Sequence, residues 1–209
     1  VLDFRGVSYA TAEPVSLGGA SLATSTGVSS FAGPVTLGAG GGTFNVGSGA
    51  QLTLNGAVGG TTAFLKSGSG TLVLGSGNTH TSLTTVNAGV LSLSSGAGLG
   101  ATTQGTVVAS GASLELQGGI TVGSEPLTIS GTGFGGTGAL RNKSGNNVYG
   151  GVVTLGANAR VVSDAGTFTL SNPGNISGTG LTLTIGGAGN VLIGSVIATR
   201  SGGVVKEGV

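Results

Sequence analysis

The stretch "TGLTLTIGGAGNVLIGSVIATR" (residues 179–200) contains short runs in which apolar residues alternate with Thr or other small residues. Alternation with a period of two is the pattern of a half-buried β-strand. The Gly-Gly and Gly-Asn pairs between the runs supply the positive φ angles that tight turns need. Residues 179–200 are therefore predicted to form three short strands joined by turns.

The same stretch interrupts an internal repeat. Three pairs of segments align: residues 2–19 with 114–131, 31–39 with 149–157, and 64–68 with 204–208. Their offsets are 112, 118 and 140, so the second increase is much the larger, and it falls where 179–200 lie. An insertion as long as 179–200 with three strands is most simply one complete coil of a three-sided β-solenoid, because each coil contacts only its neighbours. A sandwich or a barrel would have to accept three new strands into a closed sheet order.

Alternating runs of the same kind continue along the rest of the chain. They are "VTL" 35–37, "TFNV" 43–46, "QLTL" 51–54, "TLVL" 71–74, "VLSL" 90–93, "SLELQ" 113–117, "PLTIS" 126–130, "VVTL" 152–155, "TFTL" 167–170, "LTLTI" 181–185 and "VLIG" 191–194. No stretch of about ten residues carries the i, i+3, i+4, i+7 apolar spacing of a helix. The predicted fold class is all-β, a parallel β-helix of about nine or ten coils of roughly 20–22 residues each.

One solenoid is expected to cover residues 1–209. Within it, residues 1–65 are expected to repeat 113–206, and 204–209 to begin a further repeat that stops in mid-motif. An uncapped solenoid end presents unpaired strand edges. Neighbouring solenoid repeats, of the same or of an identical chain, are therefore the expected partners, stacked end to end.

The composition restricts the function classes. Charged residues make up 6% of the chain and the net charge is +1, so no electrostatic surface for nucleic acid is expected. Gly is abundant, at 47 residues, but the low charge and 38% hydrophobic content argue against disorder. No apolar run approaches the roughly 20 residues of a membrane span. Attachment to a membrane is expected only through an anchor that lies outside this sequence.

Residues 66–93, "KSGSGTLVLGSGNTHTSLTTVNAGVLSL", resemble the autotransporter-associated β-strand repeat. The matching residues are Lys66, Gly68, Gly70, Thr71, Leu72, Leu74, Asn78, Thr84 or Thr85, Val86, Gly89, Leu91 and Leu93. His80 stands where the family usually has Tyr, and Leu83 replaces a usual Gly. The flanking residues resemble the segments between such motifs, so the resemblance extends over essentially the whole chain.

The resemblance implies a right-handed β-helix in the exported part of a Gram-negative surface protein. Such parts serve as stalks, adhesins or fibres outside the cell. An extracellular or cell-surface location follows from the same resemblance, and a surface glycan or a host or matrix ligand is the binding partner that an adhesin would have. The motif specifies an architecture and an export route, and no catalytic residues or cofactors come with it.

The acidic residues do not suggest a catalytic site. They are Asp3, Glu13, Glu115, Glu125, Asp164 and Glu207. Asp3 with Glu115, and Glu13 with Glu125, are repeat-equivalent pairs that lie several coils apart in an ideal stack, too far apart to act together in catalysis. Structural or solvated roles are expected for all of them, and neither a catalytic nor a Ca²⁺ site is predicted.

Other candidate motifs give no site either. His80 is the only histidine and the chain has no Cys, so neither a metal site nor His-assisted nucleophilic catalysis is expected. "GTGFGG" (131–136) contains G-x-G-x-x-G, but no helix follows, so no dinucleotide cofactor is expected. "RNK" (141–143) is interpreted as a solvated turn, and Asn146–Asn147 as either a polar ladder or a turn.

The function predicted from these observations is structural and non-catalytic: a β-helical stalk, adhesin-type or fibre-forming segment of a bacterial surface protein. One alternative is a subunit that assembles head to tail into an extracellular filament. A second alternative is a carbohydrate-active β-helix enzyme, in which Glu115, Glu125 or Asp164 would be essential for activity.

Overall fold

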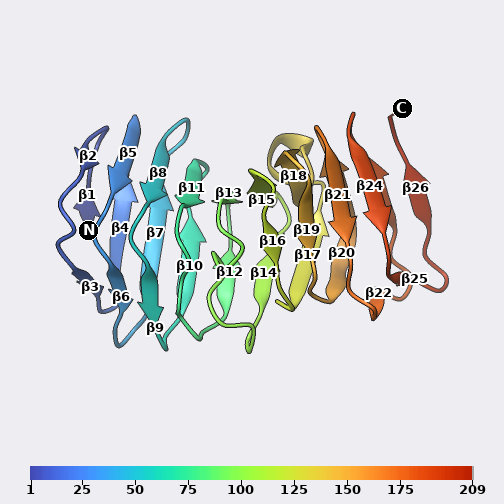
Figure 1. The fold of residues 1–209 in the computed structure, drawn as a ribbon, viewed down its shortest axis with the longest axis horizontal. Coiled ribbons are helices and arrows are strands. Elements are labelled where there is room, and N and C mark those ends of the chain that lie inside the picture. The colour runs from blue at the N-terminus through green and yellow to red at the C-terminus, as the bar shows by residue number, and fades with distance from the viewer. Residues whose placement is uncertain (209) are drawn as a thin grey trace.

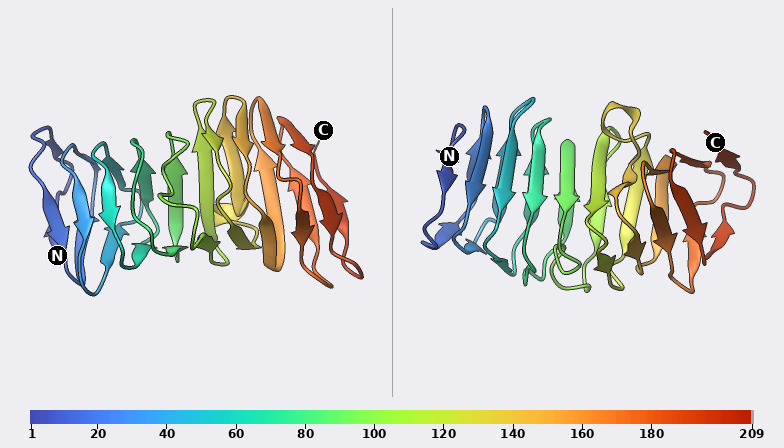
Figure 2. Two further views of the ribbon diagram at one scale, coloured as in Figure 1. Left: turned by 60° about the horizontal axis from the view of Figure 1, so that its bottom comes forward. Right: turned by 45° about the horizontal axis from the view of Figure 1, so that its top comes forward.

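Short strands separated by glycine-containing corners wind the chain into a β-solenoid of about nine turns. The structure is a computed structural model, and it describes residues 1–208. Figure 1 shows the turns stacked along one long axis, with the two termini at opposite ends, and the views in Figure 2 show the same stacking. The predicted all-β parallel solenoid is thus confirmed.

The strands lie on three faces, and on each face strands of adjacent turns pair in parallel. The first two faces are continuous along the stack, whereas the third is divided into two separate sheets. The first face consists of β1 (Leu2–Asp3), β4 (Ala20–Thr24), β7 (Gly42–Val46), β10 (Phe64–Ser67), β12 (Thr84–Val86), β14 (Thr106–Val108), β17 (Leu127–Gly131), the beginning of β20 (Val153–Ser163), β22 (Asn175–Ser177) and β25 (Val196–Ala198). The second face consists of β2 (Ser8–Tyr9), β5 (Val28–Phe31), β8 (Gln51–Leu54), β11 (Thr71–Leu74), β13 (Gly89–Leu93), β15 (Ala112–Gln117), β18 (Leu140–Ser144), the end of β20, β23 (Leu183–Gly186) and β26 (Val204–Lys206). The third face consists of β3 (Val15–Leu17), β6 (Val35–Leu37), β9 (Val58–Gly60), β16 (Thr121–Val122), β19 (Asn147–Tyr149), β21 (Thr167–Leu170) and β24 (Asn190–Ile193).

The core is built from lines of inward side chains that stack from turn to turn. On the second face one line consists of Leu52, Leu72, Leu91, Leu114, Leu140, Val161 and Ile185. All of them are buried. A fully buried Leu contributes about 1.5–3 kcal/mol through removal of its apolar surface from water, so a core of this kind stabilises each turn through its two neighbours.

Residues 179–200 contain β23, β24 and β25, which lie on the second, third and first faces respectively. They therefore provide one strand to every face, as expected for one complete coil. The repeat of 1–65 in 113–206 stays a prediction. Its aligned segments occupy different faces in the structure: Leu2 is on the first face and its counterpart Leu114 on the second. Of the further repeat expected at 204–209, Val209 lies outside the described residues.

All eleven alternating runs overlap strands of the structure. The longest difference is at 152–155, where β20 continues to Ser163 and turns from the first face to the second without interruption. Among residues 1–208 the helical content is one 3₁₀ turn, η1 (Phe134–Gly136), and no helix long and apolar enough to cross a membrane occurs there.

Candidate functional site

The two halves of the 66–93 motif lie on adjacent turns and pair with each other. β10 pairs with β12, which places Lys66 beside Val86. β11 pairs with β13, which places Leu72 beside Leu91 and, two residues further, Leu74 beside Leu93. The length of the motif is explained by this pairing: the motif contains two strands of one turn and the two strands of the next turn that stack on them.

Lys66 is fully buried, although its side chain carries a charge. Its Nζ donates hydrogen bonds to three backbone carbonyl oxygens, those of Ser67 and Gly68 at 2.8 Å and that of Ala88 at 3.0 Å. The first two carbonyls belong to its own corner and the third to the next turn. Burial lowers the pKa of Lys66 from 10.5 to about 8, so the ammonium form still predominates at neutral pH. The three donors of this ammonium group fasten the corner of one turn to the turn that follows.

Two motif glycines are required because the corners of successive turns touch. Gly68 has a φ of 73°, and a Cβ there would lie 2.2 Å from the carbonyl oxygen of Val46. Gly89 has a φ of 67°, and its Cβ would lie 2.4 Å from the carbonyl oxygen of Gly70. Any side chain at these positions would push two turns apart.

Asn78 takes the place of a strand on the third face. It is buried and lies outside any strand, in the segment between β11 and β12. On the third face this segment occupies the gap between β9 and β16. Its Oδ1 accepts the backbone N–H of Val58 at 2.8 Å, and its Nδ2 donates to the carbonyl oxygen of Gly98 at 2.5 Å. One amide thus connects the turn before with the turn after, and it satisfies backbone groups that a regular ladder would otherwise pair.

His80 is fully buried against an aromatic ring. Its imidazole stacks on Phe64 with the ring centres 5.0 Å apart, and its Nε2 lies 2.9 Å from Oγ1 of Thr84. Its Nδ1 is buried without a hydrogen-bond partner. Burial lowers the pKa of His80, so the ring is neutral at pH 7. The ring therefore packs inside the solenoid, at the position where the repeat that 66–93 resembles usually has Tyr.

Glu115 and Asp164, two acids considered above for catalysis, share one partner. Arg141 donates from Nη1 to Oε1 of Glu115 at 2.5 Å and from Nε to Oδ2 of Asp164 at 2.7 Å. Lys143 lies 3.7 Å from the other oxygen of Glu115. These residues come from β15, β18 and the residue after β20, so they join three successive turns across the second face. The interpretation of 141–143 as a solvated turn is wrong, because Arg141 lies within β18 and its guanidinium binds both acids.

Glu125 is an acid buried without a cation. It is 2% exposed, and its Oε1 accepts a hydrogen bond from Oγ1 of Thr106 at 3.0 Å. Its Oε2 is buried without a partner, and burial raises the pKa of Glu125 to about 7. Tyr149, whose Oη donates to the backbone carbonyl of Glu125 at 2.9 Å, has a pKa raised well above its usual value by burial and by this neighbouring carboxyl group.

Asn142 and Asn147 form a buried polar network at a corner between the second and third faces. Nδ2 of Asn147 donates to Oδ1 of Asn142, and Oδ1 of Asn147 accepts the N–H of Ile120 at 2.7 Å. The neighbouring Asn146 accepts the N–H of Thr167 at 2.9 Å. The hydrogen bonds of Asn146 and Asn147 both reach other turns of the solenoid, which is what a polar ladder would do.

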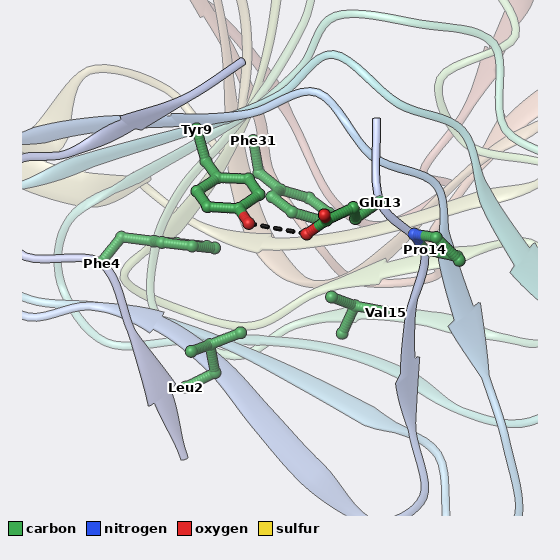
Figure 3. Close-up of a pocket in the computed structure, with 7 residues that line it drawn as sticks. All are labelled: Leu2, Phe4, Tyr9, Glu13, Pro14, Val15 and Phe31. Atoms are coloured by element: carbon green, nitrogen blue, oxygen red, sulfur yellow. Dashed lines mark hydrogen bonds between the residues drawn. The ribbon is translucent and has the colours of Figure 1, made fainter. Parts of the chain in front are cut away.

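A hollow of about 230 Å³ lies in the first turn (Figure 3). Its lining residues are Leu2, Phe4, Tyr9, Glu13, Pro14, Val15 and Phe31. Phe4 stacks on Phe31 at 5.5 Å, and the hydroxyl of Tyr9 donates to Glu13 at 2.7 Å. Phe4 and Val15 pack against the main core, so the hollow is the end of that core and not a separate cleft.

The remaining acids are also engaged. Asp3 accepts hydrogen bonds from the backbone and the hydroxyl of Ser25, and these bonds lower the pKa of Asp3 to about 2. Glu207 pairs with Arg160 at 3.0 Å. Within residues 1–208, no three His, Asp or Glu side chains gather in a way that could hold a metal ion. Asp3, Glu115, Glu125, Asp164 and Glu207 thus bind groups of other turns, and Glu13 binds Tyr9 within the first turn.

A family model described as passenger-associated-transport-repeat matches residues 64–93. The match covers β10 to β13, the two turns in which Lys66 and Asn78 hold the corners, and it confirms the passenger repeat expected at 66–93. No curated protein and no solved structure matches the chain.

Proposed function

We propose that the chain is a structural, non-catalytic segment of an exported passenger, forming part of a rigid stalk or fibre at the surface of a Gram-negative bacterium. The observation that carries the proposal is the passenger-repeat match at 64–93, within a continuous solenoid. The polar residues of that motif are directed to backbone groups, as Lys66 and Asn78 show. Because these polar groups of the motif bind the backbone of neighbouring turns, they support a mechanical role.

The mechanical part follows from the parallel ladders. Every turn is held to the next by backbone hydrogen bonds on the first and second faces, over most of the stack also on the third, and by a continuous apolar core. Each turn can fold on the one before it, because it contacts only its neighbours. A chain that leaves the cell as an unfolded strand would therefore gain structure turn by turn on the outside, which supports the proposal of a transport role for the motif.

The absence of catalysis is part of the proposal and is supported by the acids. Glu115 and Asp164 are paired with Arg141, and Glu125 is buried. A glycoside hydrolase site of the usual kind would need two carboxyl groups facing one substrate. Substitution of Glu115 or Asp164 is therefore expected to lower the stability of the chain. It is not expected to abolish a polysaccharide-cleaving activity.

Neighbouring repeats are the partners that this function implies, and the residues 204–208 support such a continuation. Nζ of Lys206 donates to the carbonyl oxygens of Glu207 at 2.6 Å and of Gly208 at 3.4 Å. These are the carbonyls at the same two positions, one and two residues on, as those that Lys66 binds. Gly208 also has a positive φ of 76°, as Gly68 does. We propose that 204–208 form the opening corner of another repeat of this type.

The transport role can be tested in a Gram-negative host. The chain would be placed between a signal peptide and an autotransporter translocator, with an epitope tag before residue 1. Surface exposure of the tag would be compared for the wild type, Asn78→Leu and the matched control Thr79→Ser, which leaves the amide of Asn78 in place. Wild type and control are expected at the surface in equal amounts, and Asn78→Leu at a lower amount. Equal exposure of all three would remove the support for a role of the motif in export.

A further inference from the structure

Asn55 is the one asparagine of the sequence that is followed by a glycine. It comes directly after β8, at the corner that leads from the second face to β9 on the third face. Its side chain is exposed, and its amide group has no hydrogen-bond partner among residues 1–208. Asn55 therefore carries a side-chain amide that is free to turn toward the backbone of its own corner.

The asparagines in the middle of the stack are held differently. The amides of Asn78, Asn142 and Asn147 are buried and bind groups of other turns. The side-chain oxygens of Asn146 and Asn158 accept the N–H groups of residues on the next turn, at 2.9 and 2.8 Å. An amide that is fixed by such a bond is not available for a reaction with its own main chain.

The main chain at Gly56 supplies a nitrogen atom with the same freedom. The N–H of Asn55 donates to the carbonyl oxygen of Phe31 at 2.8 Å, and this bond ends the ladder of β8. The next N–H, that of Gly56, donates to no group in the described part of the chain. Because glycine has no Cβ, no side chain stands between its nitrogen and the amide of the residue before it.

We propose that Asn55–Gly56 is a site of covalent self-modification, at which asparagine is converted to aspartate and isoaspartate. The nitrogen of Gly56 attacks Cγ of Asn55, so that a bond from nitrogen to Cγ forms and the bond from Cγ to Nδ2 breaks. The proton of the Gly56 N–H leaves with the amide group as ammonia, and a five-membered succinimide ring remains.

Water opens this ring in one of two ways. It adds its oxygen to one of the two ring carbonyl carbons and returns a proton to the nitrogen. Opening at Cγ gives aspartate, and opening at the backbone carbonyl carbon gives isoaspartate, in which the main chain passes through Cγ. The reaction consumes water and releases ammonia, and it requires no enzyme and no oxidant.

The product does not fit the corner as well as asparagine does. A Cβ on Gly56 would lie 2.0 Å from the carbonyl oxygen of Gly33 on the turn before, and one on Gly75 of the turn after would lie 3.0 Å from Oδ1 of Asn55. Isoaspartate adds a methylene group to the main chain between these two turns, and an extra methylene in a close-packed place is destabilising. The new carboxylate also lowers the formal net charge from +1 to 0.

Asn87 is a matched comparison within the same chain. It comes directly after β12, its side chain is exposed, and its N–H donates to the carbonyl oxygen of Lys66 at 3.0 Å. Neither its amide nor the N–H of Ala88 has a hydrogen-bond partner in the part of the chain that the structure describes. The two sites differ in the residue that follows: the Cβ of Ala88 hinders the approach of the nitrogen to Cγ.

The experiment is incubation of the purified, folded chain at pH 6 and at pH 8, at about 37 °C. Samples are digested and analysed by mass spectrometry, which locates the gain of one mass unit, and an isoaspartyl methyltransferase labels the isoaspartate. A sample taken at time zero corrects for conversion during digestion. Asn55 is expected to convert several-fold faster than Asn87, and faster at pH 8, because the attacking nitrogen must lose its proton. Asn55→Gln should yield no acidic form on ion exchange over the same period.

The same incubation in urea separates the effect of the fold from that of the sequence. Conversion of Asn55 in urea but not in the folded chain would overturn the proposal, because it would show that the corner protects the amide. Equal rates at Asn55 and Asn87 in the folded chain would also overturn it. The acidic form, isolated by ion exchange, is expected to unfold at a lower temperature than the unconverted chain, and an unchanged temperature would contradict the strain inferred between Gly33 and Gly75.

Discussion

Glu115 and Arg141 lie on two adjacent turns, and their side chains meet at 2.5 Å. The carboxylate is 3% exposed and the guanidinium 22%, so the pair lies in the wall of the solenoid and not on its solvated surface. Because Arg141 also binds Asp164 of the following turn, one side chain connects three turns. Pairs of opposite charge about one coil apart are the signal by which this clamp could have been found in the sequence.

Arg141→Met is expected to lower the free energy of unfolding by about 3–5 kcal/mol, because it leaves the carboxylate of Glu115 buried without its main partner. Urea denaturation followed by circular dichroism measures the change. Lys143→Met provides the comparison: its ammonium is half exposed and 3.7 Å from Glu115, so the loss is under about 1 kcal/mol. A loss for Arg141→Met as small as that of Lys143→Met would mean that the clamp does not stabilise the stack.

Glu125→Gln is expected to stabilise the chain at neutral and alkaline pH. The pKa of Glu125 is about 7 in the folded chain and 4.5 in a model peptide. Between these values the unfolded chain releases its proton while the folded chain keeps it, so the wild type loses stability as the pH rises from 4.5 to 7. Gln has no proton to lose, and the advantage of the variant grows over that range to roughly 3 kcal/mol at most.

Thermal denaturation of wild type and Glu125→Gln at pH 4, 5.5 and 8 measures this difference. The two proteins should differ least at pH 4, where the carboxyl group is mostly protonated in both the folded and the unfolded chain. A difference that is the same at all three pH values would show that Glu125 ionises freely in the folded chain.

His80 is expected to act in the opposite direction. Its pKa is lowered by burial below the ordinary 6.5, so the unfolded chain binds a proton first as the pH falls. Stability is therefore complete above pH 6.5 and is lost as the pH falls toward the folded pKa. His80 is the only histidine, so its ring signals in an NMR titration are unambiguous. A midpoint at or above 6.5 would contradict the burial of the ring, and His80→Phe should abolish its share of the acid sensitivity.

Lys66→Met is expected to cost about 2–3 kcal/mol of unfolding free energy, because the carbonyls of Ser67, Gly68 and Ala88 lose their donor inside the fold. Lys206→Met is the matched control at an exposed corner and should cost under about 0.5 kcal/mol. The folded pKa of about 8 adds a pH signature: the wild type gains stability as the pH rises from 8 to 10.5, and the Met variant does not. Equal effects of the two substitutions would contradict the role given to Lys66.

Much of the fold could be predicted from local patterns. The alternating runs at 51–54, 71–74 and 167–170 coincide with β8, β11 and β21, since period-2 alternation records which side chains face the core. The residues of the candidate site were harder to predict from the sequence. Glu125 stands before a proline and has no sequence feature that separates a buried acid from a solvated one.

The register between turns could not be predicted from the sequence alone. Phe64 pairs with Thr84, whereas Leu127 pairs with Val153, so the step in residue number from one turn to the next is larger in the second case. The corner loops vary in length, so the partner of a given residue in the next turn cannot be found at a fixed spacing. The clamp at Arg141 and the acceptor that Lys66 finds on the next turn both depend on that register.

By itself the sequence determined that short strands turn at glycines and stack as coils, because alternation and turn chemistry act between residues close in the chain. The tertiary structure alone decided which residues meet across turns, and hence that Glu125 and His80 are buried as titratable groups. The reason is physical: burial and cross-turn contact depend on the cumulative lengths of the corners, and a change of one residue in a strand's register moves a side chain from the core to the surface.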